Sequence, residues 1–211
     1  MKKYIVSTLL AFAAIASNGQ AAVVYNNGAP ASNNGNETTQ WIQAEDFTIA
    51  GGATVSHATV YLGSFNGIGA WDGHLAYAIY ANAGGQPGSV LAGGDAANVT
   101  VSDSGFPWLA GNAFAFDFDI NPFAAAAGTT YWFGIHASAN FDRDEIYWVT
   151  TGAFGNGNEA FSGGPTWSSN GSEHAFTLSD QGTPTTDVPE PGTAALIAAG
   201  LLAGAVRRRK A

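Results

Sequence analysis

The sequence predicts an all-β fold, an antiparallel β-sandwich of the jelly-roll kind, preceded by a signal-peptide helix and followed by a short apolar C-terminal helix. Three observations predict the sandwich. Apolar residues alternate with polar or small ones in many segments, clusters of Gly, Asn and Pro separate these segments, and only 11% of the 211 residues are charged. Alternation with a period of two is typical of a half-buried strand, whereas the exposed faces of helices are normally built from Glu and Lys.

The clearest strand covers residues 113–120, in which Phe114, Phe116, Phe118 and Ile120 alternate with small or acidic residues. We therefore expect the even positions of this segment to face the core and the odd ones to face water. The same kind of pattern predicts further strands at residues 41–49, 54–62, 75–79, 131–136, 145–149 and 174–178.

The segment 41–49 contains a change of apolar phase. Ile42 and Ala44 are apolar at even positions, whereas Phe47 and Ile49 are apolar at odd ones. A β-bulge inserts one extra residue into a strand and so shifts the alternation. The sequence therefore predicts a bulge between Ala44 and Phe47.

The body of the chain is strongly acidic. Residues 22–188 contain fifteen acidic residues and one basic residue, Arg143, and the chain has no Cys. Nucleic-acid binding is not expected, because phosphate neutralisation needs clustered Lys and Arg, and disulfides and thiolate sites are excluded. Divalent cations or neutral polymers such as glycans suit this charge better. The expected organisation is a signal peptide at 1–21, a β-sandwich domain at 22–181, a linker at 182–187 and a sorting tail at 188–211.

The N-terminus has the three regions of a secretory signal. Lys2 and Lys3 precede an apolar run at residues 4–16, and small residues then lead to Ala21. This order is the one that the secretion machinery and signal peptidase recognise. We expect cleavage after Ala21, and cleavage after Ala22 satisfies the same preference for small residues.

The C-terminus combines a proline-rich motif, a short apolar segment and a basic end. If it is helical, the apolar segment of thirteen residues rises only about 20 Å, less than the roughly 30 Å of a hydrocarbon core, so it is a marginal membrane anchor. The basic end should stay in the cytoplasm, which places the body of the protein outside. In chain order the three parts are Pro189, Glu190 and Pro191, then residues 194–206, then Arg207, Arg208, Arg209 and Lys210.

This combination resembles the PEP-CTERM sorting signal over residues 189–211. The resemblance implies recognition by an exosortase, a membrane cysteine transpeptidase of Gram-negative bacteria. Cleavage near Pro189-Glu190-Pro191 would then transfer the body to an acceptor at the cell surface or in the extracellular matrix, after transient anchoring in the inner membrane. A plain tail anchor is the alternative interpretation.

The body also resembles a known kind of domain at two places. Residues 80–92, with their glycine-rich centre, and residues 127–132 are similar to the choice-of-anchor domains found in many PEP-CTERM proteins. This resemblance implies a β-sandwich and implies no activity.

One acidic segment suggests a cation site. Asn140, Asp142 and Asp144 offer oxygen ligands at alternate positions, which suits Ca²⁺. The glycine and the final glutamate that an EF-hand loop requires are missing at the corresponding positions. A solvated acidic loop, partly neutralised by Arg143, is the alternative interpretation.

Two further groups of residues suggest ligand chemistry. Trp71 and Trp167 lie near predicted loops, where exposed rings can stack on sugars, although aromatic rings also fill cores. Asp117 and Asp119 share the wet face of one strand, and such a carboxylate pair permits a glycosidase. Neither has an identifiable apolar pocket that would raise its pKa. The four histidines, on separate predicted strands, are expected to face water.

Three hypotheses for function follow. The first is a non-enzymatic exported protein of the cell surface or extracellular matrix, sorted by an exosortase and associated with extracellular polysaccharide. The second is a glycan-binding module that uses Trp71 and Trp167. The third is a secreted hydrolase that uses Asp117 and Asp119. The first predicts no catalytic residues, and Ca²⁺ is the one cofactor that a sequence motif suggests.

Overall fold

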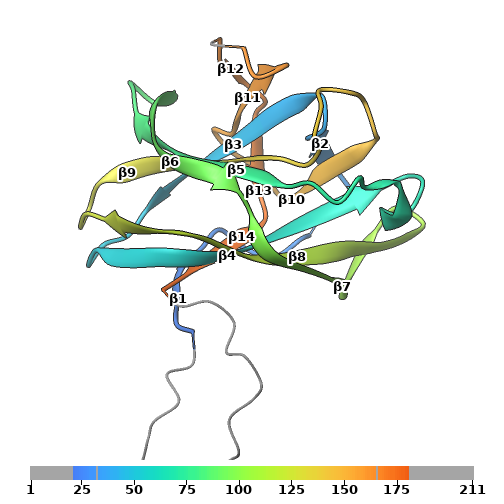
Figure 1. Cartoon of the computed structure of the whole chain (residues 1–211), viewed down its shortest axis with the longest axis horizontal. Coiled ribbons are helices and arrows are strands. Elements are labelled where there is room, and N and C mark those ends of the chain that lie inside the picture. The colour runs from blue at the N-terminus through green and yellow to red at the C-terminus, as the bar shows by residue number, and fades with distance from the viewer. Residues whose placement is uncertain (1–20, 32, 165, 181–211) are drawn as a thin grey trace, which may run out of the picture. The chain divides into compact units, whose positions relative to one another are not determined.

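The computed structural model describes residues 21–31, 33–164 and 166–180, which form two antiparallel sheets packed face to face as a sandwich (Figure 1). The predicted signal-peptide helix, linker and C-terminal helix lie outside these residues. Within the described ranges, the helical element is one 3-10 turn, Ile68–Ala70. No helix in this part of the chain is long and apolar enough to cross a membrane.

The first sheet has eight strands. Its main path runs β1-β14-β4-β10-β13, while β8 pairs with β4, β7 pairs with β8, and β2 pairs with β10. The strands are β1 (Val23–Asn26), β2 (Gly35–Glu37), β4 (Ala53–Ser64), β7 (Ala97–Trp108), β8 (Gly111–Ala125), β10 (Ile146–Phe154), β13 (Ser172–His174) and β14 (Phe176–Ser179).

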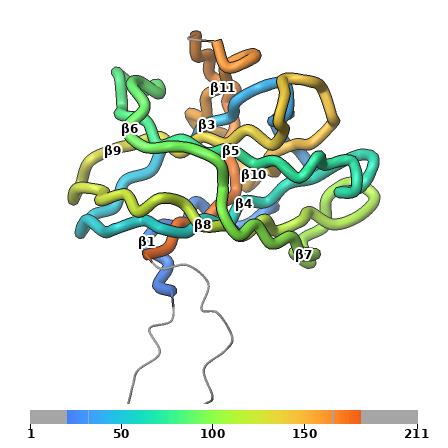
Figure 2. Tube along the Cα trace, in the orientation of Figure 1, coloured from blue at the N-terminus to red at the C-terminus, as the bar shows by residue number. Residues whose placement is uncertain are grey.

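The second sheet has six strands in the order β12-β11-β3-β9-β5-β6. The β5–β6 and β7–β8 hairpins each stay within one sheet, and most other connections cross between the sheets. Figure 2 shows one such crossing, in which the chain passes from β6 in one layer to β7 in the other. The strands are β3 (Trp41–Thr48), β5 (Ala76–Asn82), β6 (Pro87–Asp95), β9 (Thr130–His136), β11 (Asn158–Phe161) and β12 (Ser168–Ser169).

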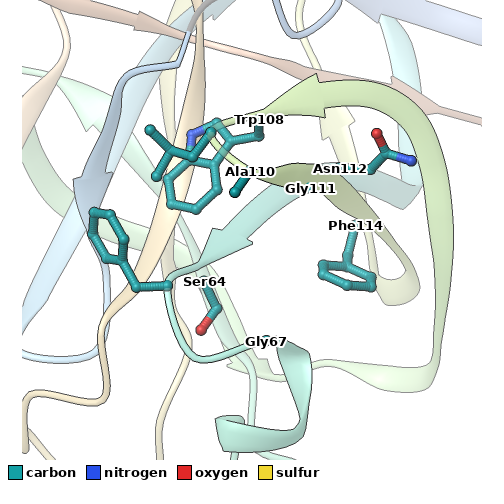
Figure 3. A pocket seen from close by; sticks show the side chains of 9 residues that line it. Ser64, Gly67, Trp108, Ala110, Gly111, Asn112 and Phe114 are labelled. Carbon is teal, nitrogen blue, oxygen red and sulfur yellow. The ribbon is translucent and has the colours of Figure 1, made fainter.

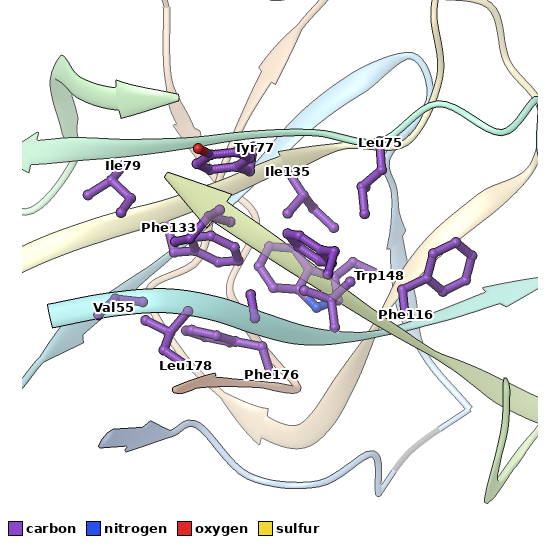
Figure 4. Close-up of a cluster of buried hydrophobic side chains, with 14 of the residues drawn as sticks. Val55, Leu75, Tyr77, Ile79, Phe116, Phe133, Ile135, Trp148, Phe176 and Leu178 are labelled. Atoms are coloured by element: carbon purple, nitrogen blue, oxygen red, sulfur yellow. The ribbon is translucent and has the colours of Figure 1, made fainter. Parts of the chain in front are cut away.

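The core lies between the two sheets and is rich in aromatic rings (Figure 4). Phe116, Phe118 and Ile120 of β8 are buried there, which confirms the predicted alternation over residues 116–120. At residues 113–115 the prediction is wrong, because Ala113 and Ala115 are buried and Phe114 is half-buried. Phe133 from the second sheet stacks on Phe176 from the first, with ring centroids 5.6 Å apart. Fully burying one such side chain contributes about 2 to 3 kcal/mol, so alternate residues of these strands hold the two layers together.

The chain enters and leaves the sandwich at one edge of the eight-stranded sheet. β1 pairs with β14, the last described strand. The backbone N–H of Ala22 donates to Oδ1 of Asp180 at 2.9 Å, and the backbone N–H of Asp180 donates to the carbonyl of Ala22 at 3.1 Å. The residue that follows the predicted cleavage point is therefore part of the folded domain. Cleavage itself stays a prediction.

Two glycines inside β6 were misread as a turn. Gly93 and Gly94 were expected to form a turn, but both lie inside β6 and pair with β5. A Cβ at Gly93 would lie only 2.9 Å from the carbonyl oxygen of Tyr77. Glycine inside a strand often marks such a close approach of two backbones, so this composition does not identify a turn.

The predicted β-bulge in β3 is wrong. β3 pairs with β9 in one continuous register. Because Gln43 and Glu45 share the face of the core residue Phe47, they point inward and are fully buried. Ile42 and Ala44 therefore point outward. The apolar phase changes because two inward positions carry polar side chains, not because a residue is inserted.

Candidate functional site

The outward side of the six-stranded sheet has a floor of small residues at its centre. Ala44 of β3 and Ala78 of β5 both pair with Gly134 of β9. Because Gly134 has no side chain, the ring of Tyr80 lies close against the strand, and a Cβ at this position would be 2.9 Å from Cε2 of Tyr80. In β3 the outward residue opposite Gly134 is Ala44, so this part of the floor carries no large side chain.

Two adjoining hollows share Ile42 and Tyr80 in their walls, and the smaller one lies over Ala78 and Gly134 of this floor. Their volumes are about 130 Å³ and about 500 Å³. Trp167, just before β12, forms one side of the larger hollow, and its ring meets that of Tyr80 edge-on at 5.3 Å. Pro87 and Val90 of β6 line the same hollow, and Val90 is 61% exposed. We call the two hollows together the outer groove.

A buried tryptophan supports the outer groove from below. Trp132 is fully buried in a small cluster with Ala44 and Tyr80, and Trp167 packs against this cluster. The indole nitrogen of Trp132 donates to Oδ1 of Asn82 at 3.1 Å, which fixes the ring. Burial raises the pKa of Tyr80 to about 12, so its hydroxyl stays neutral and keeps its hydrogen-bond donor.

The two tryptophans that were expected to stack on sugars lie in different surroundings. Trp167 lines the outer groove, as described above. Trp71 lies at the margin of the core, with its ring edge-on to Phe116 at 4.9 Å and its indole nitrogen donating to the carbonyl of His74 at 2.8 Å. Trp71 is half-buried and lines none of the hollows described here.

A third hollow, of about 290 Å³, lies beside the turn that joins β7 to β8 (Figure 3). Trp108 and Phe65 stand together in its wall with ring centroids 5.5 Å apart. Trp108 is only 3% exposed, so its faces are not available for stacking, and its buried Nε1 has no hydrogen-bond partner among the described residues. No site residue predicted from the sequence lines this hollow.

The acidic loop that suggested Ca²⁺ lies on the surface. Asn140 and Asp142 are exposed and Asp144 is half-buried. Arg143 pairs with Glu145, its Nε lying 2.9 Å from Oε1. The guanidinium therefore neutralises the residue that follows the three proposed ligands. Calcium binding by this loop stays a prediction.

Asp117 and Asp119 form a polar ladder with His57 on the outer side of the eight-stranded sheet. Nδ1 of His57 lies 3.0 Å from Oδ1 of Asp119, and Nε2 lies 3.9 Å from Oδ1 of Asp117. The nearby His57 ring lowers the pKa of Asp117, and the hydrogen bond from Asn98 lowers the pKa of Asp119. A glycosidase needs one carboxyl whose pKa is raised, so the lowered pKa values of both aspartates do not favour the hydrolase hypothesis.

The expectation that the histidines face water is wrong for three of the four. His174 is fully buried, and His57 and His136 are 7% and 8% exposed. His136 shows why a strand can bury this side chain. Its Nε2 lies 2.7 Å from the carbonyl oxygen of Thr39, and its ring stacks on Phe141 at 4.2 Å. Each ring finds a polar partner on another strand or loop, which alternation along one strand does not reveal.

The most deeply buried polar pair is His174 with Glu45. Oε2 of Glu45 lies 2.7 Å from Nδ1 of His174 and accepts the backbone N–H of the same residue at 2.8 Å. Nε2 of His174 lies 3.1 Å from Oδ1 of Asn36, and its ring stacks on Trp148 at 4.6 Å. Desolvation raises the pKa of Glu45 to about 8 and lowers the pKa of His174 to about 3. The raised pKa of Glu45 and the lowered pKa of His174 both favour an uncharged pair that shares one hydrogen.

Comparison with known proteins bears on the C-terminus. Residues 187–210 match the model of the PEP-CTERM protein-sorting motif. The match covers Pro189, Glu190, Pro191 and the arginines 207–209, all of which lie outside the residues that the structure describes. No curated protein and no solved structure matches the chain. The similarity of the body to choice-of-anchor domains therefore stays a prediction.

Proposed function

We propose that this chain, which ends in a PEP-CTERM protein-sorting motif, is an exported surface protein whose sandwich binds a neutral extracellular polysaccharide in the outer groove. The motif implies export and sorting by an exosortase, and proteins with this motif are attached at the cell surface of Gram-negative bacteria. Binding of polysaccharide is the step that we add. The proposal includes no catalysis by the sandwich.

The observation that carries the proposal is the pairing of Trp167 and Tyr80 beside a floor of small residues. Sugar rings present apolar C–H faces that pack against aromatic rings, and half-buried Trp167 is the ring that lines this hollow, while buried Tyr80 meets it edge-on from behind. The larger hollow, of about 500 Å³, has the size of an ordinary ligand site. Its open form suits a segment of a polymer.

Charge restricts the class of polysaccharide. Residues 22–188 contain fifteen acidic residues against Arg143 alone. An anionic polymer would be repelled by this field and would find few cationic partners. A neutral polysaccharide is therefore the ligand that fits.

Affinity electrophoresis in gels that contain neutral polysaccharides tests the binding step. We expect the wild-type protein to be retarded by at least one of them, and Trp167→Ala to weaken the affinity about tenfold, because it removes the ring on one side of the groove. Phe154→Ala is the matched control, since Phe154 is 100% exposed and does not line the groove. Binding that is unchanged in Trp167→Ala, or absent in the wild-type protein, would refute the polysaccharide step.

Replacement of Pro189, Glu190 and Pro191 together by alanine tests the sorting step. In the native host we expect the wild-type protein to lose its tail and leave the inner membrane, and the triple variant to retain the tail and stay in the membrane fraction. Pro184→Ala, in the predicted linker, is the control for loss of a nearby proline. Intact mass and fractionation are the measurements. Identical results for the triple variant and the wild type would contradict sorting through this motif.

A further inference from the structure

Three carboxylates meet where β3 approaches β13, away from the outer groove and the acidic loop. Glu45, Asp46 and Glu173 each place an oxygen within 4.8 Å of an oxygen of the other two. Glu45 is fully buried, whereas Asp46 and Glu173 are half-buried. The cluster therefore joins the two sheets and opens to solvent on one side.

The charges of this cluster are not balanced by a basic side chain. Arg143 is the only Lys or Arg in residues 22–188, and its partner is Glu145. Carboxylates at this separation repel each other strongly when they are partly buried. To lie this close together, the three carboxylates need a positive charge or protons that their own side chains do not supply.

The oxygens of Glu45 differ in their partners. Oε2 takes both hydrogen bonds from His174, as described above. Oε1 is buried and has no hydrogen-bond partner among the described residues. Because Oε2 faces both the backbone nitrogen and Nδ1 of His174, Oε1 is the oxygen left for a further partner. A buried oxygen without a partner is costly, and a bound cation is one way to satisfy it.

Neighbouring residues hold the half-buried ligands in place. Nδ2 of Asn27 donates to Oε1 of Glu173 at 3.1 Å and to the carbonyl of His174 at 2.8 Å. The hydroxyl of Tyr25 donates to Oδ1 of Asn27 at 2.7 Å.

We propose that Glu45, Asp46 and Glu173 form a calcium site that ties β3 to β13. Ca²⁺ prefers oxygen ligands at about 2.3 to 2.6 Å, so two ligands on one ion stand up to about 5 Å apart. A separation of up to 4.8 Å matches this spacing. Mg²⁺, with ligands at about 2.0 to 2.1 Å, needs oxygens that are closer together. Water on the open side completes the coordination.

Thermal unfolding of the purified protein, in saturating CaCl₂ and in EDTA, tests the site. We expect Ca²⁺ at a hundredfold excess over its Kd to raise the Tm by about 5 to 10 °C, because it binds only the folded state. A second readout is Tb³⁺ luminescence excited through Trp148, whose ring stacks on His174 beside the site.

Glu173→Gln is the test variant, because Glu173 is half-buried and the amide keeps the size of the side chain. We expect it to fold, as its Tm in EDTA will show, and to lose most of the Ca²⁺-induced rise and of the Tb³⁺ signal. Asp144→Asn is the matched control that removes one carboxylate from the acidic loop, and it should keep both.

Three results would overturn the proposal. The first is a wild-type Tm that is the same in CaCl₂ and in EDTA, together with no Tb³⁺ signal. The second is a Ca²⁺ response that survives Glu173→Gln and disappears in Asp144→Asn, which would place the ion in the acidic loop. The third is an equal rise in Tm with Mg²⁺, which would show a divalent-cation site without the preference for Ca²⁺ that we propose.

Discussion

The buried pair of Glu45 and His174 predicts strongly non-additive effects on stability. The perturbations are His174→Phe, Glu45→Leu and the double variant, all of which keep the volume of the side chains close to the native one. His174→Phe removes Nδ1 and leaves a fully buried carboxyl with the backbone N–H of residue 174 as its remaining partner on Oε2. Glu45→Leu leaves Nδ1 of His174 without a partner in the same dry environment.

The magnitudes follow from burial. Both side chains are 0% exposed, so water cannot replace the lost hydrogen bond. We expect His174→Phe and Glu45→Leu each to cost about 1 to 3 kcal/mol, because each leaves a neutral buried polar group without its partner. The double variant should lie within about 2 kcal/mol of the wild type, because apolar replacement of both partners removes both unsatisfied groups.

Urea unfolding of the four proteins in EDTA is the assay, since EDTA removes any contribution from a bound cation. The denaturant m-values should agree, so that differences in midpoint report stability alone. The coupling free energy should be at least about 1 kcal/mol, which is above the error of such a cycle. If the two single losses simply add up in the double variant, the pair is not a coupled buried unit and the reasoning is refuted.

Two further predictions concern other parts of the sandwich. Asp117 and Asp119 raise the pKa of His57, so its contribution to stability is fully present below about pH 6.5 and is lost as the pH rises through the raised folded value. The lowered pKa values of the two aspartates add stability that is lost only below about pH 4. Urea unfolding should therefore show that His57→Gln costs about 1 kcal/mol at pH 5 and less at pH 9, and an equal cost at both would contradict this assignment. Gly63→Ala should destabilise the protein by about 1 to 3 kcal/mol and change the tryptophan fluorescence, because the new Cβ would lie 2.6 Å from Cε2 of Trp108. An unchanged unfolding midpoint and spectrum would show that the Trp108 ring moves aside at little cost.

The fold could be predicted where the side chains of one strand decide its two faces. β8 is such a strand, since Phe116 and Phe118 are buried as the alternation requires. The alternation of apolar and polar residues could not predict the extent of β6, because its glycines have no side chains that would show which face is buried. β3 was misread for the opposite reason, as Glu45 is a polar residue at an inward position whose partner is 129 residues away along the chain.

The candidate sites also differ in how far the sequence could predict them. Trp167 was predicted as a ligand contact from its place near a loop, and the structure puts it in the outer groove. The contact of Trp167 with Tyr80 could not be predicted, because nothing in the sequence distinguishes Tyr80 from other aromatic residues of the strands. Nor could the cluster of Glu45, Asp46 and Glu173, since the third ligand lies on a strand of the other sheet.

The sequence by itself determined the all-β class, the acidic charge and the sorting motif at residues 187–210. These are local properties, each carried by consecutive residues and recognised without a partner elsewhere in the chain. Only the tertiary structure decided that Glu45 turns inward to His174, that Gly134 leaves room for an aromatic groove, and that three carboxylates meet between the sheets. Each of these depends on which distant strands become neighbours, and burial then sets the energy of polar groups that would be unremarkable in water.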